Sequence, residues 1–379
     1  MGARDSEPEQ PPPIAARTAI VHDWFQGYHG AERTVEVLRN GLFGEGAGAD
    51  VFTFHAAREL LPAGLSGAIV RESRLASLPG FRQRGHDPGL WRYLLPAMPR
   101  FFRRLPLDAY DLVIATSHAF AVQARPRVGA TFVCYCFTPI RYAWLPETDQ
   151  RLRLLQPWLR RIDLEASRRP DAYIAISGAV RDRIRRFYGR DAVVIHPPVE
   201  TEEFSVGRER DPEHFVWVHR LVSYKRPEVV VEAFRGLPYR LTMVGVGPQE
   251  AKLRRDLPPN VTLLPWVSRE ELVRLFEDAA GFIHVGEEDF GISMVEALAA
   301  GTPVIALARG GAVDIVRDGI DGVLVARPEP GLVREAVRRV AAERWDASAL
   351  AGRAREFSRE RFLTRMGAYL SELLPKAYP

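Results

Sequence analysis

The segment GFIHVGEEDFGISMVEALAAGTPVIALA, residues 281–308, decides how this chain folds. It opens with a short apolar run typical of a buried strand and then turns at an acidic stretch. A helix is expected from near Gly291, and a second apolar run, TPVIALA, closes the segment. Because two strands joined by a helix-length crossover lie parallel in one sheet, the segment predicts a strand–helix–strand unit.

The same alternation runs through the chain on both sides of this unit. The apolar runs are TAIVHDW (18–24), ADVFTFH (49–55), DLVIAT (111–116), TFVCYCF (131–137), AYIAIS (172–177), AVVIHPP (192–198), HFVWVHRL (214–221), YRLTMVGVG (239–247), VTLLPWV (261–267) and GVLVA (322–326). Strands separated by helix-length segments predict an α/β protein with parallel sheets covered by helices on both faces.

Two domains are expected from the length of 379 residues, which exceeds one ordinary core. A stretch rich in proline and charge, HPPVETEEFSVGRERDPEH (196–214), interrupts both periodicities and is typical of a linker. We therefore expect a disordered tail at 1–16, a first domain at 17–200, a second at 201–356 and a final helix within 357–379. Apolar residues at helical spacing predict that this helix buries one face: Phe357, Phe362, Met366, Tyr369, Leu370 and Leu373.

The composition excludes a wholly disordered chain. Hydrophobic residues make up 46% and charged residues 26% of the chain, which is typical of a folded globular protein. No apolar run reaches the roughly 18 residues that span a bilayer, and the N-terminus lacks a secretory layout, so we expect a cytoplasmic protein. The two cysteines, Cys134 and Cys136, are expected to be reduced residues of a core strand.

The positive charge is concentrated in the first half of the chain. The net charge is +4, and residues 1–200 carry 27 arginines against 21 acidic residues. Almost all of the positive charge is arginine, a skew that indicates genome composition rather than nucleic-acid binding, so no nucleic-acid partner is expected. A membrane or polyanionic partner is expected to meet the first half.

The acidic turn and helix of residues 286–306 form the first candidate site. The backbone amides of Gly291, Ile292 and Ser293 at a helix N-terminus can hold a phosphate. Glu288 precedes this helix and Glu296 lies in its second turn, so the two carboxylates can grip different parts of one ligand. The same spacing also fits a capped helix with solvated acids.

Three further places follow predicted strands, where α/β sheets bind ligands. Arg220 and Lys225 can clamp a diphosphate, although a solvated pair also fits. Gly30, in HDWFQGYHGAERTVEVL (22–38), allows close approach of a ligand to the backbone, and a plain turn is the alternative. His118, after DLVIAT, stands where a substrate contact is expected, but a packed or capping histidine fits equally.

Together these features resemble the GT-B glycosyltransferases of family 4, also called glycosyl transferases group 1. EDFGISMVEALAAGTPVIA (288–306) is similar to the family's E-x-F-G-x(4)-E signature with its alanine-rich helix and G-x-P-V strand, and the resemblance runs from about 18 to 373. It implies two Rossmann-like doubly wound domains facing a central cleft. The acceptor would bind 17–200 and the nucleotide sugar 201–356, with 357–379 crossing back to the first domain.

The resemblance also implies roles for individual residues. Glu288 contacts the donor sugar and stabilises the transition state, Phe290 to Ser293 present backbone to sugar and phosphate, and Glu296 binds the ribose. Arg220 and Lys225 match the family's diphosphate-binding R-x(4)-K pair. His118 falls where the family keeps a histidine near the reaction centre, and HGAER (29–33) resembles its G-G-A-E-R turn, with His29 in place of the first glycine and Gly30 as the second.

A narrower resemblance concerns the donor sugar. CYCFTPIRYAW (134–144) is similar to the Y-C-H-T-P-x-R-Y-x-W segment of O-antigen-type mannosyltransferases, with Phe137 in place of the histidine. It favours GDP-mannose as donor, and UDP-sugars remain open. The expected acceptor is a glycan or polyprenyl-diphosphate-linked precursor. The basic, aromatic stretch 71–104 fits either the inner-membrane surface or a plain helical cover of the sheet.

The resemblance implies a retaining, metal-independent hexosyltransferase without a cofactor, in which the leaving phosphate accepts the proton of the acceptor. No Asp-x-Asp triplet occurs in the chain, which agrees with a site without a metal. Three alternatives stay open: a GT-B sugar-nucleotide epimerase, a transferase that uses a UDP-sugar with a soluble acceptor, and a nucleotide-binding protein without turnover.

Overall fold

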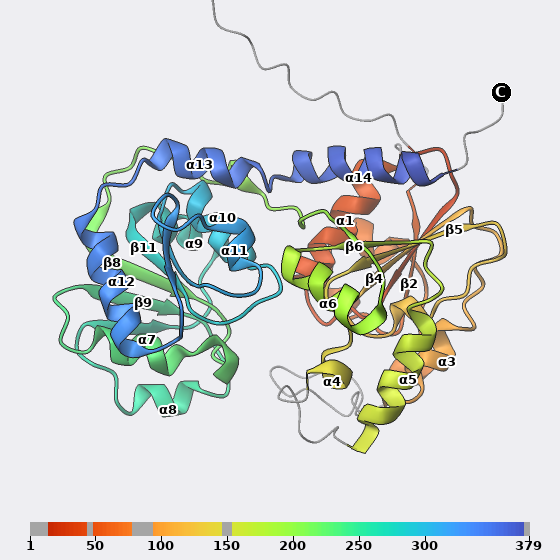
Figure 1. Cartoon of the computed structure of the whole chain (residues 1–379), viewed down its shortest axis with the longest axis horizontal. Coiled ribbons are helices and arrows are strands. Elements are labelled where there is room, and N and C mark those ends of the chain that lie inside the picture. The colour runs from red at the N-terminus through yellow and green to blue at the C-terminus, as the bar shows by residue number, and fades with distance from the viewer. Residues whose placement is uncertain (1–13, 44–47, 78–93, 146–153, 375–379) are drawn as a thin grey trace, which may run out of the picture. The chain divides into compact units, whose positions relative to one another are not determined.

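The chain folds into two compact units, each built around its own parallel sheet (Figure 1). The computed structural model describes residues 14–43, 48–77, 94–145 and 154–374. Unit 1 comprises Met1–Pro198 and Glu360–Pro379, and unit 2 comprises Val199–Arg359. Of the tail expected at 1–16, residues 1–13 lie outside the described residues, and the backbone N–H of Ile14 donates to the carbonyl of Leu42 at 2.9 Å.

All strand pairs in both sheets are parallel, as the alternating pattern predicts. The order is β3-β2-β1-β4-β5-β6-β7 in unit 1 and β10-β9-β8-β11-β12-β13 in unit 2. The strands are β1 Thr18–His22, β2 Asp50–Thr53, β3 Ile69–Arg71, β4 Leu112–Ser117, β5 Thr131–Cys136, β6 Ala172–Ala175, β7 Val193–Val194, β8 Asp211–Val218, β9 Arg240–Val244, β10 Val261–Leu264, β11 Ala279–His284, β12 Val304–Leu307 and β13 Gly322–Val325.

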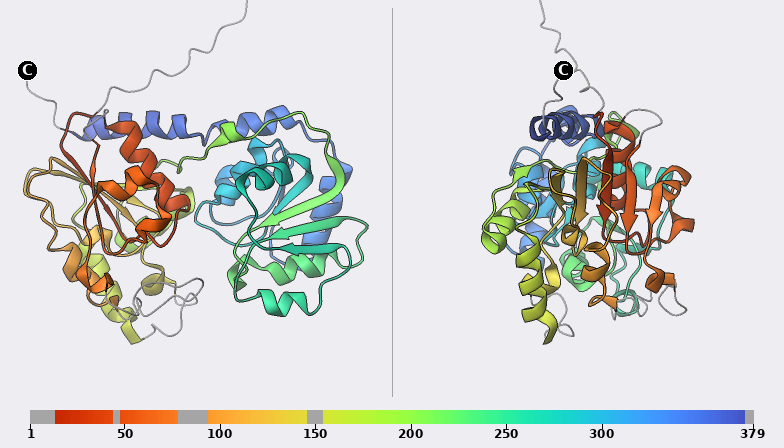
Figure 2. Two further views of the ribbon diagram at one scale, coloured as in Figure 1. Left: turned by 180° about the vertical axis from the view of Figure 1, so that it is seen from behind. Right: turned by 90° about the vertical axis from the view of Figure 1, so that its right-hand side faces the viewer.

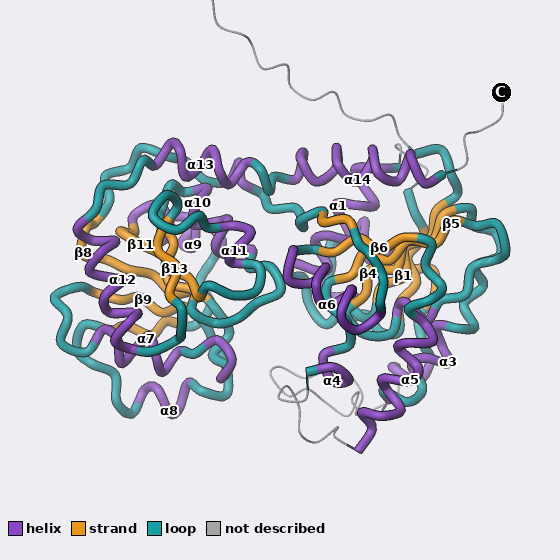
Figure 3. Tube along the Cα trace, viewed as in Figure 1, coloured by secondary structure: helices purple, strands orange, loops and turns teal. Residues whose placement is uncertain are grey.

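Helices surround both sheets (Figure 3). They are α1 Gly30–Leu42, α2 Ala63–Ala68, α3 Met98–Phe102, α4 Arg141–Trp144, α5 Gln156–Ala166, α6 Gly178–Tyr188, α7 Pro227–Phe234, α8 Glu250–Arg254, α9 Arg269–Asp278, α10 Ile292–Ala299, α11 Ala312–Ile315, α12 Pro330–Ala342, α13 Ala347–Arg355 and α14 Arg359–Leu373. Their ends follow ordinary capping chemistry: Ser268 and Glu271 form a reciprocal capping box at α9, and Gly189 ends α6 at φ 63°.

Two details of unit 1 and unit 2 differ from the sequence pattern. Strand β3 was not predicted, because its three residues are too few to show a periodic pattern. Strand β8 begins at Asp211, inside the stretch interpreted as a linker, so its first residues are polar although they belong to the strand. Cys134 and Cys136 are free and buried in β5.

The C-terminal helix α14 packs on unit 1. Leu363 lies so close to α1 that a Cβ placed on Gly41 would be 2.5 Å from its methyl groups. The ring of Phe362 lies 6.0 Å from that of Tyr135 on β5. Figures 1 and 2 show the blue helix α14 beside α1. Of the predicted apolar face, Phe362, Met366 and Leu370 are buried in unit 1, and Tyr369 and Leu373 are half-buried. Phe357 differs from the prediction, because it precedes α14, belongs to unit 2 and has its ring 5.8 Å from that of Phe290.

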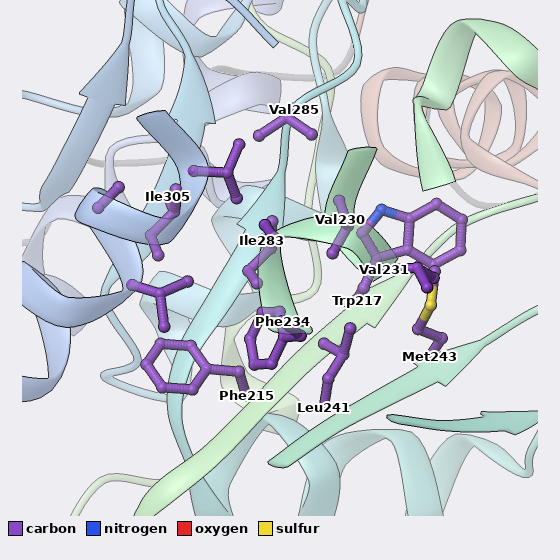
Figure 4. Packing of buried hydrophobic residues seen from close by; sticks show 14 of the residues in the cluster. Phe215, Trp217, Val230, Val231, Phe234, Leu241, Met243, Ile283, Val285 and Ile305 are labelled. Carbon is purple, nitrogen blue, oxygen red and sulfur yellow. The ribbon is translucent and has the colours of Figure 1, made fainter. Parts of the chain in front are cut away.

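In unit 2 the main core lies between the sheet and helices α7 and α12. Figure 4 shows Phe215 and Trp217 of β8 and Met243 of β9 packed with Phe234 of α7. Helices α9 and α10 contact the strands as well, through β8, β11 and β12. A sheet enclosed by helices leaves the loops at the carboxyl ends of its strands as the place for a ligand.

Candidate functional site

Lys225 and Glu288 form an ion pair at the carboxyl edge of the unit 2 sheet. Lys225 ends the short helix η7 (Ser223–Lys225) after β8, and Glu288 lies in the loop after the adjacent strand β11. The Lys225 side chain is 7% exposed and that of Glu288 is 24% exposed. A cation and a carboxylate that are partly shielded from water interact more strongly than a surface pair, and a ligand phosphate can compete for the cation.

Arg220 stands two residues beyond the end of β8 and is exposed. Within the part of the chain that the structure describes, it makes no ion pair. The loop that carries it is held by backbone contacts with the turn after β9, because a Cβ on Gly245 would lie 1.9 Å from the carbonyl oxygen of His219. A Cβ on Gly247 would lie 2.5 Å from the carbonyl oxygen of Leu221. The glycines let two neighbouring loops touch and fix the backbone of Arg220.

The N-terminus of α10 begins at Gly291, which has φ 107°, a value that only glycine adopts readily. Phe290 before it is 4% exposed, whereas Ile292 and Ser293 are half-buried. The four first amides of a helix have no intrahelical partner. The structure therefore places the backbone N–H groups of Ile292 and Ser293 at the edge of the sheet that also carries Lys225.

A glycine turn after β12 supports this loop. The N–H of Gly311 donates to the carbonyl of Glu288 at 2.9 Å. A Cβ on Gly311 would lie 2.3 Å from the Cα of Phe290, and one on Gly310 would lie 2.1 Å from the Glu288 carbonyl oxygen. Two backbone segments are thus in direct contact, and no side chain fits between them.

Glu296 makes an ion pair with Arg269, the first residue of α9, with 2.7 Å between Oε1 and Nη1. Arg269 also contacts Glu203 at 2.6 Å. Burial opposes the charge of Arg269, but the two carboxylates outweigh it and raise its pKa. The Glu296 side chain is 10% exposed, so its carboxylate is oriented before any ligand arrives.

In unit 1, His118 follows β4 and lies beside the carboxylate of Asp23, which follows β1. The distance from His118 Nδ1 to Asp23 Oδ2 is 3.4 Å, and the imidazole packs edge-on against Trp24 at 4.6 Å. Burial, followed by the nearby His118, lowers the pKa of His22 to about 3. His22 is therefore neutral at physiological pH.

Gly30 is the first residue of α1 and is half-buried. The helix start is stabilised by Glu32, whose carboxylate accepts the N–H of His29 at 3.0 Å. Burial raises the pKa of Glu32 to about 7. His29, which stands where the family's first glycine is expected, is exposed and caps this turn.

The structure thus brings Arg220, Lys225, Glu288, Glu296 and the start of α10 together on unit 2, and it places His118 and Gly30 after adjacent strands of unit 1. Sequence reasoning missed Asp23 and Arg269, as well as the glycines at 245, 247, 310 and 311. The glycines could have been found, because each follows a predicted strand at the ligand-binding edge. Arg269 gives no local signal, since its partner Glu296 is 27 residues away.

Two family profiles match the chain. "Glycosyl transferases group 1" matches residues 198–358, and "Glycosyltransferase Family 4" matches residues 28–203. The D-inositol 3-phosphate glycosyltransferase of Mycobacterium sp. (strain JLS) is 36% identical over 155 residues, which is 35% of each chain. That of Mycobacterium tuberculosis (strain F11) is 34% identical over 167 residues, 38% of this chain and 35% of the relative. The matched region spans about a third of the length of these curated relatives.

Solved structures share the fold over nearly the whole chain. HepE of Anabaena in complex with UDP superposes with a TM-score of 0.69 at 18% identity, covering 94% of this chain and 100% of that one. Sucrose-phosphate synthase of Thermosynechococcus elongatus gives a TM-score of 0.72 at 18% identity, covering 94% and 99%. At such identities the likeness concerns the fold. With two parallel sheets and family profiles that together match residues 28–358, this chain belongs to the GT-B glycosyltransferases of family 4.

Proposed function

We propose that this protein is a retaining, metal-independent glycosyltransferase that moves a hexose, with mannose favoured, from a nucleotide diphosphate sugar to a lipid-linked or polysaccharide-precursor glycan. The observation that carries the proposal is the partly buried pair of Lys225 and Glu288 beside the N-terminus of α10. A cation for a diphosphate and a carboxylate for a sugar are thereby held at one edge of one sheet.

The diphosphate is proposed to bind Lys225, Arg220 and the first amides of α10. Lysine supplies a point charge, arginine a planar fork of donors, and the helix N-terminus a partial positive charge. These groups stabilise the negative charge that grows on the leaving diphosphate. Because the protein's own cations can supply this charge, we propose that the reaction needs neither a metal nor another cofactor.

Glu288 is proposed to contact the donor sugar and to stabilise positive charge at its anomeric carbon. Glu296, oriented by Arg269, is proposed to accept hydrogen bonds from the ribose. His118 of unit 1 is proposed to contact the donor sugar near the reacting carbon. In the transfer, the bond from the anomeric carbon to the phosphate oxygen breaks and a bond to the acceptor hydroxyl oxygen forms on the same face. The hydroxyl proton passes to the leaving phosphate.

The acceptor is proposed to be polyprenyl-diphosphate-linked and to be met at the cytoplasmic face of the membrane. The helix α5 supports this surface, because Leu154 just before it is 94% exposed and Trp158 and Leu164 are each 37% exposed among arginines. Stretch 71–104 supports it less: residues 78–93 lie outside the described residues, and Leu95 and Phe102 are core residues. No helix in the described ranges is long and apolar enough to cross a bilayer.

A nucleotide-sugar panel tests the proposal. Purified protein is mixed with GDP-mannose, GDP, UDP-glucose, UDP, ADP-glucose and dTDP-glucose in the presence of EDTA, and Tm is measured; a ligand of the native state raises Tm by mass action. UDP-glucose is included because HepE has been solved with it. We expect GDP-mannose and GDP to give the largest shifts. A shift by UDP compounds alone would move the proposal to a UDP-sugar donor, and no shift by any nucleotide would contradict it.

The product then defines the reaction. The sugar derivative of the nucleotide that raises Tm is supplied as donor. The acceptor is a polyprenyl-diphosphate-linked glycan in vesicles that contain anionic lipid, and NMR determines the anomeric configuration of the product. Retention is expected. Inversion would refute the retaining mechanism, while epimerisation of the sugar nucleotide without an acceptor would favour the epimerase. Binding to anionic but not neutral vesicles, lost in Trp158→Ser, would support the α5 surface.

A further inference from the structure

Two histidines lie side by side at the carboxyl edge of the unit 2 sheet. His219 follows β8, and His284 is the last residue of the neighbouring strand β11. Their ring centroids are 4.5 Å apart and their planes are nearly perpendicular, at 80°. Neither histidine has a part in the proposed reaction, and both stand next to the Lys225–Glu288 pair.

His284 is wholly buried at 0% exposure, yet neither of its ring nitrogens finds a hydrogen-bond partner among the residues that the structure describes. A buried polar group without a partner lowers stability, and an apolar side chain of the same size would fill this place at less cost. A donor that is left unsatisfied in the resting fold, at the edge of a ligand site, indicates that its hydrogen bond forms when the site is occupied.

The carboxylate of Glu288 lies close to this ring. His284 Nε2 lies 3.5 Å from Glu288 Oε2, while the other carboxylate oxygen, Oε1, contacts Lys225 Nζ. A nitrogen–oxygen distance of 3.5 Å is about 0.5 Å longer than a good hydrogen bond, so a small movement of the carboxylate closes it. Gly291 brings its backbone close to both groups, since a Cβ there would lie 3.6 Å from both His284 Cε1 and Glu288 Oε2, and 2.2 Å from the methyl carbon of Met294.

The protonation state of His284 allows its ring to donate a hydrogen bond. Burial and the charge of Lys225 lower the pKa of His284 well below its ordinary value. Lys225 and Glu288 are the charged groups that the structure places against the ring. Burial and the charge of Lys225 also lower the pKa of the neighbouring His219, which is therefore neutral. A neutral imidazole carries one N–H, and with no partner on Nδ1 that proton is able to reside on Nε2, facing the carboxylate.

Donor binding changes the partner of Glu288. Under the proposed function, on which this step rests, the diphosphate attracts the ammonium of Lys225, so the carboxylate loses part of its cation. A shielded carboxylate without a partner is unfavourable and poorly oriented. We infer that His284 is a positioning residue. When Lys225 binds the diphosphate, the Nε2–H of His284 donates a hydrogen bond to Glu288, and this bond holds the carboxylate toward the donor sugar.

Matched variants test whether the N–H or only the ring volume matters. His284→Gln places an amide N–H near the position of Nε2, His284→Asn reaches only the position of Nδ1, and His284→Phe fills the space without a donor. For a positioning residue we expect kcat to fall by about tenfold or more in the Phe and Asn variants, with donor KM changed by less than about threefold. The Gln variant is expected to stay within about threefold of wild-type kcat. Wild-type kcat in His284→Phe, or an equal loss in the Phe and Gln variants, would overturn the inference.

A second measurement follows the His284 ring in the wild-type protein and needs only the His284→Gln variant for the assignment. Protein labelled with nitrogen-15 in its histidines is titrated with GDP and with UDP, and the His284 ring signal is assigned from its absence in His284→Gln. Binding, followed separately by Tm, is expected to move the Nε2–H proton downfield as its hydrogen bond to Glu288 shortens. Binding with an unchanged ring signal would overturn the role of His284 alone. Absence of binding by either nucleotide would overturn the proposed function and this inference with it.

Discussion

The carboxylate of Asp23 determines where His118 stands. Asp23 Oδ2 accepts the backbone N–H of His118 at 2.6 Å and lies 3.4 Å from Nδ1 of the same residue. The two oxygens together accept hydrogen bonds from four consecutive backbone amides. Oδ2 also accepts from the N–H of Ala119, and Oδ1 accepts from the N–H groups of Phe120 and Ala121, at 2.5–2.8 Å. A single buried side chain after β1 thus shapes the turn after β4.

Replacing Asp23 by asparagine is expected to destabilise unit 1. Asparagine keeps one acceptor oxygen and turns an NH2 group toward two amides that then lack a partner, which costs about 3 kcal/mol of unfolding free energy. Urea unfolding measures the loss. Asp171→Asn is the control, because exposed Asp171 accepts one backbone amide, that of Phe132, at 2.8 Å. Equal losses in the two variants would contradict the special role of Asp23.

The buried Asp163 predicts a pH dependence of stability. Burial raises its pKa to about 7, so between its unfolded pKa, about 3.9, and 7 the folded state binds more protons than the unfolded state. The contribution of Asp163 to the free energy of unfolding is therefore fully present below about pH 4. It is lost as the pH rises through 7, and the total loss is up to about 4 kcal/mol.

Asp163→Asn is expected to remove this dependence. The asparagine oxygen is able to accept from Trp144 Nε1 and the Tyr188 hydroxyl, which both lie 2.7 Å from Oδ2, and it does not titrate. The variant should gain in Tm relative to wild type at pH 8 and gain little at pH 5. Because Glu32 titrates in the same direction, the comparison uses the difference between the two proteins at each pH. A difference that is independent of pH would refute the assignment.

Glu288→Gln separates chemistry from binding. The glutamine keeps the size of the side chain and an acceptor for Lys225 but removes the negative charge. We expect transfer to fall by about a hundredfold or more, while the Kd of the nucleoside diphosphate changes by less than about threefold. Single-turnover transfer and calorimetric titration measure the two effects. Unchanged transfer would show that the charge of Glu288 is not used.

Lys225→Met, in contrast to Glu288→Gln, should weaken the binding of the nucleoside diphosphate. The methionine fills the space of the lysine stem without the ammonium, so the diphosphate loses a charge-assisted contact worth about 1.5–3 kcal/mol. This corresponds to a nucleoside diphosphate Kd about ten- to a hundredfold weaker. Titration at two salt concentrations checks the result, because an ionic contact weakens with salt. A Kd equal to that of the wild type would place the diphosphate elsewhere.

Gly311→Ala is expected to disrupt the loop of Glu288. Its Cβ would meet backbone atoms of Phe290 at 2.3 Å, and backbone cannot move aside as a flexible side chain does. We expect a loss of about 2 kcal/mol in stability together with a reduced transfer rate. Gly331→Ala in α12 is the matched control, since nothing lies within 4 Å of its Cβ. It should be neutral or stabilise by about 0.5–1 kcal/mol. The same loss in both variants would contradict the contact.

The strands were predictable where both of their faces are buried. Five of the six residues of β5, TFVCYC, are buried. Its hydrophobic run is therefore nearly continuous, and such a run predicts a strand. Edge strand β3 was missed because it has only three residues, which is too short for a periodic pattern. The candidate ligand edge was equally accessible to sequence reasoning, since Arg220, Lys225 and Glu288 all follow predicted strands and the carboxyl ends of parallel strands share one edge.

By itself the sequence determined the alternation of strands and helices, the parallel sheets and the edge that carries the charged residues, because these depend on local periodicity and on chain connectivity. Only the tertiary structure decided the partners: Lys225 with Glu288, Arg269 with Glu296, and His284 beside Glu288. Those pairs depend on β8 lying next to β11 and on α9 reaching α10. Strand order and helix packing are set by the burial of the whole core, so no local pattern encodes them.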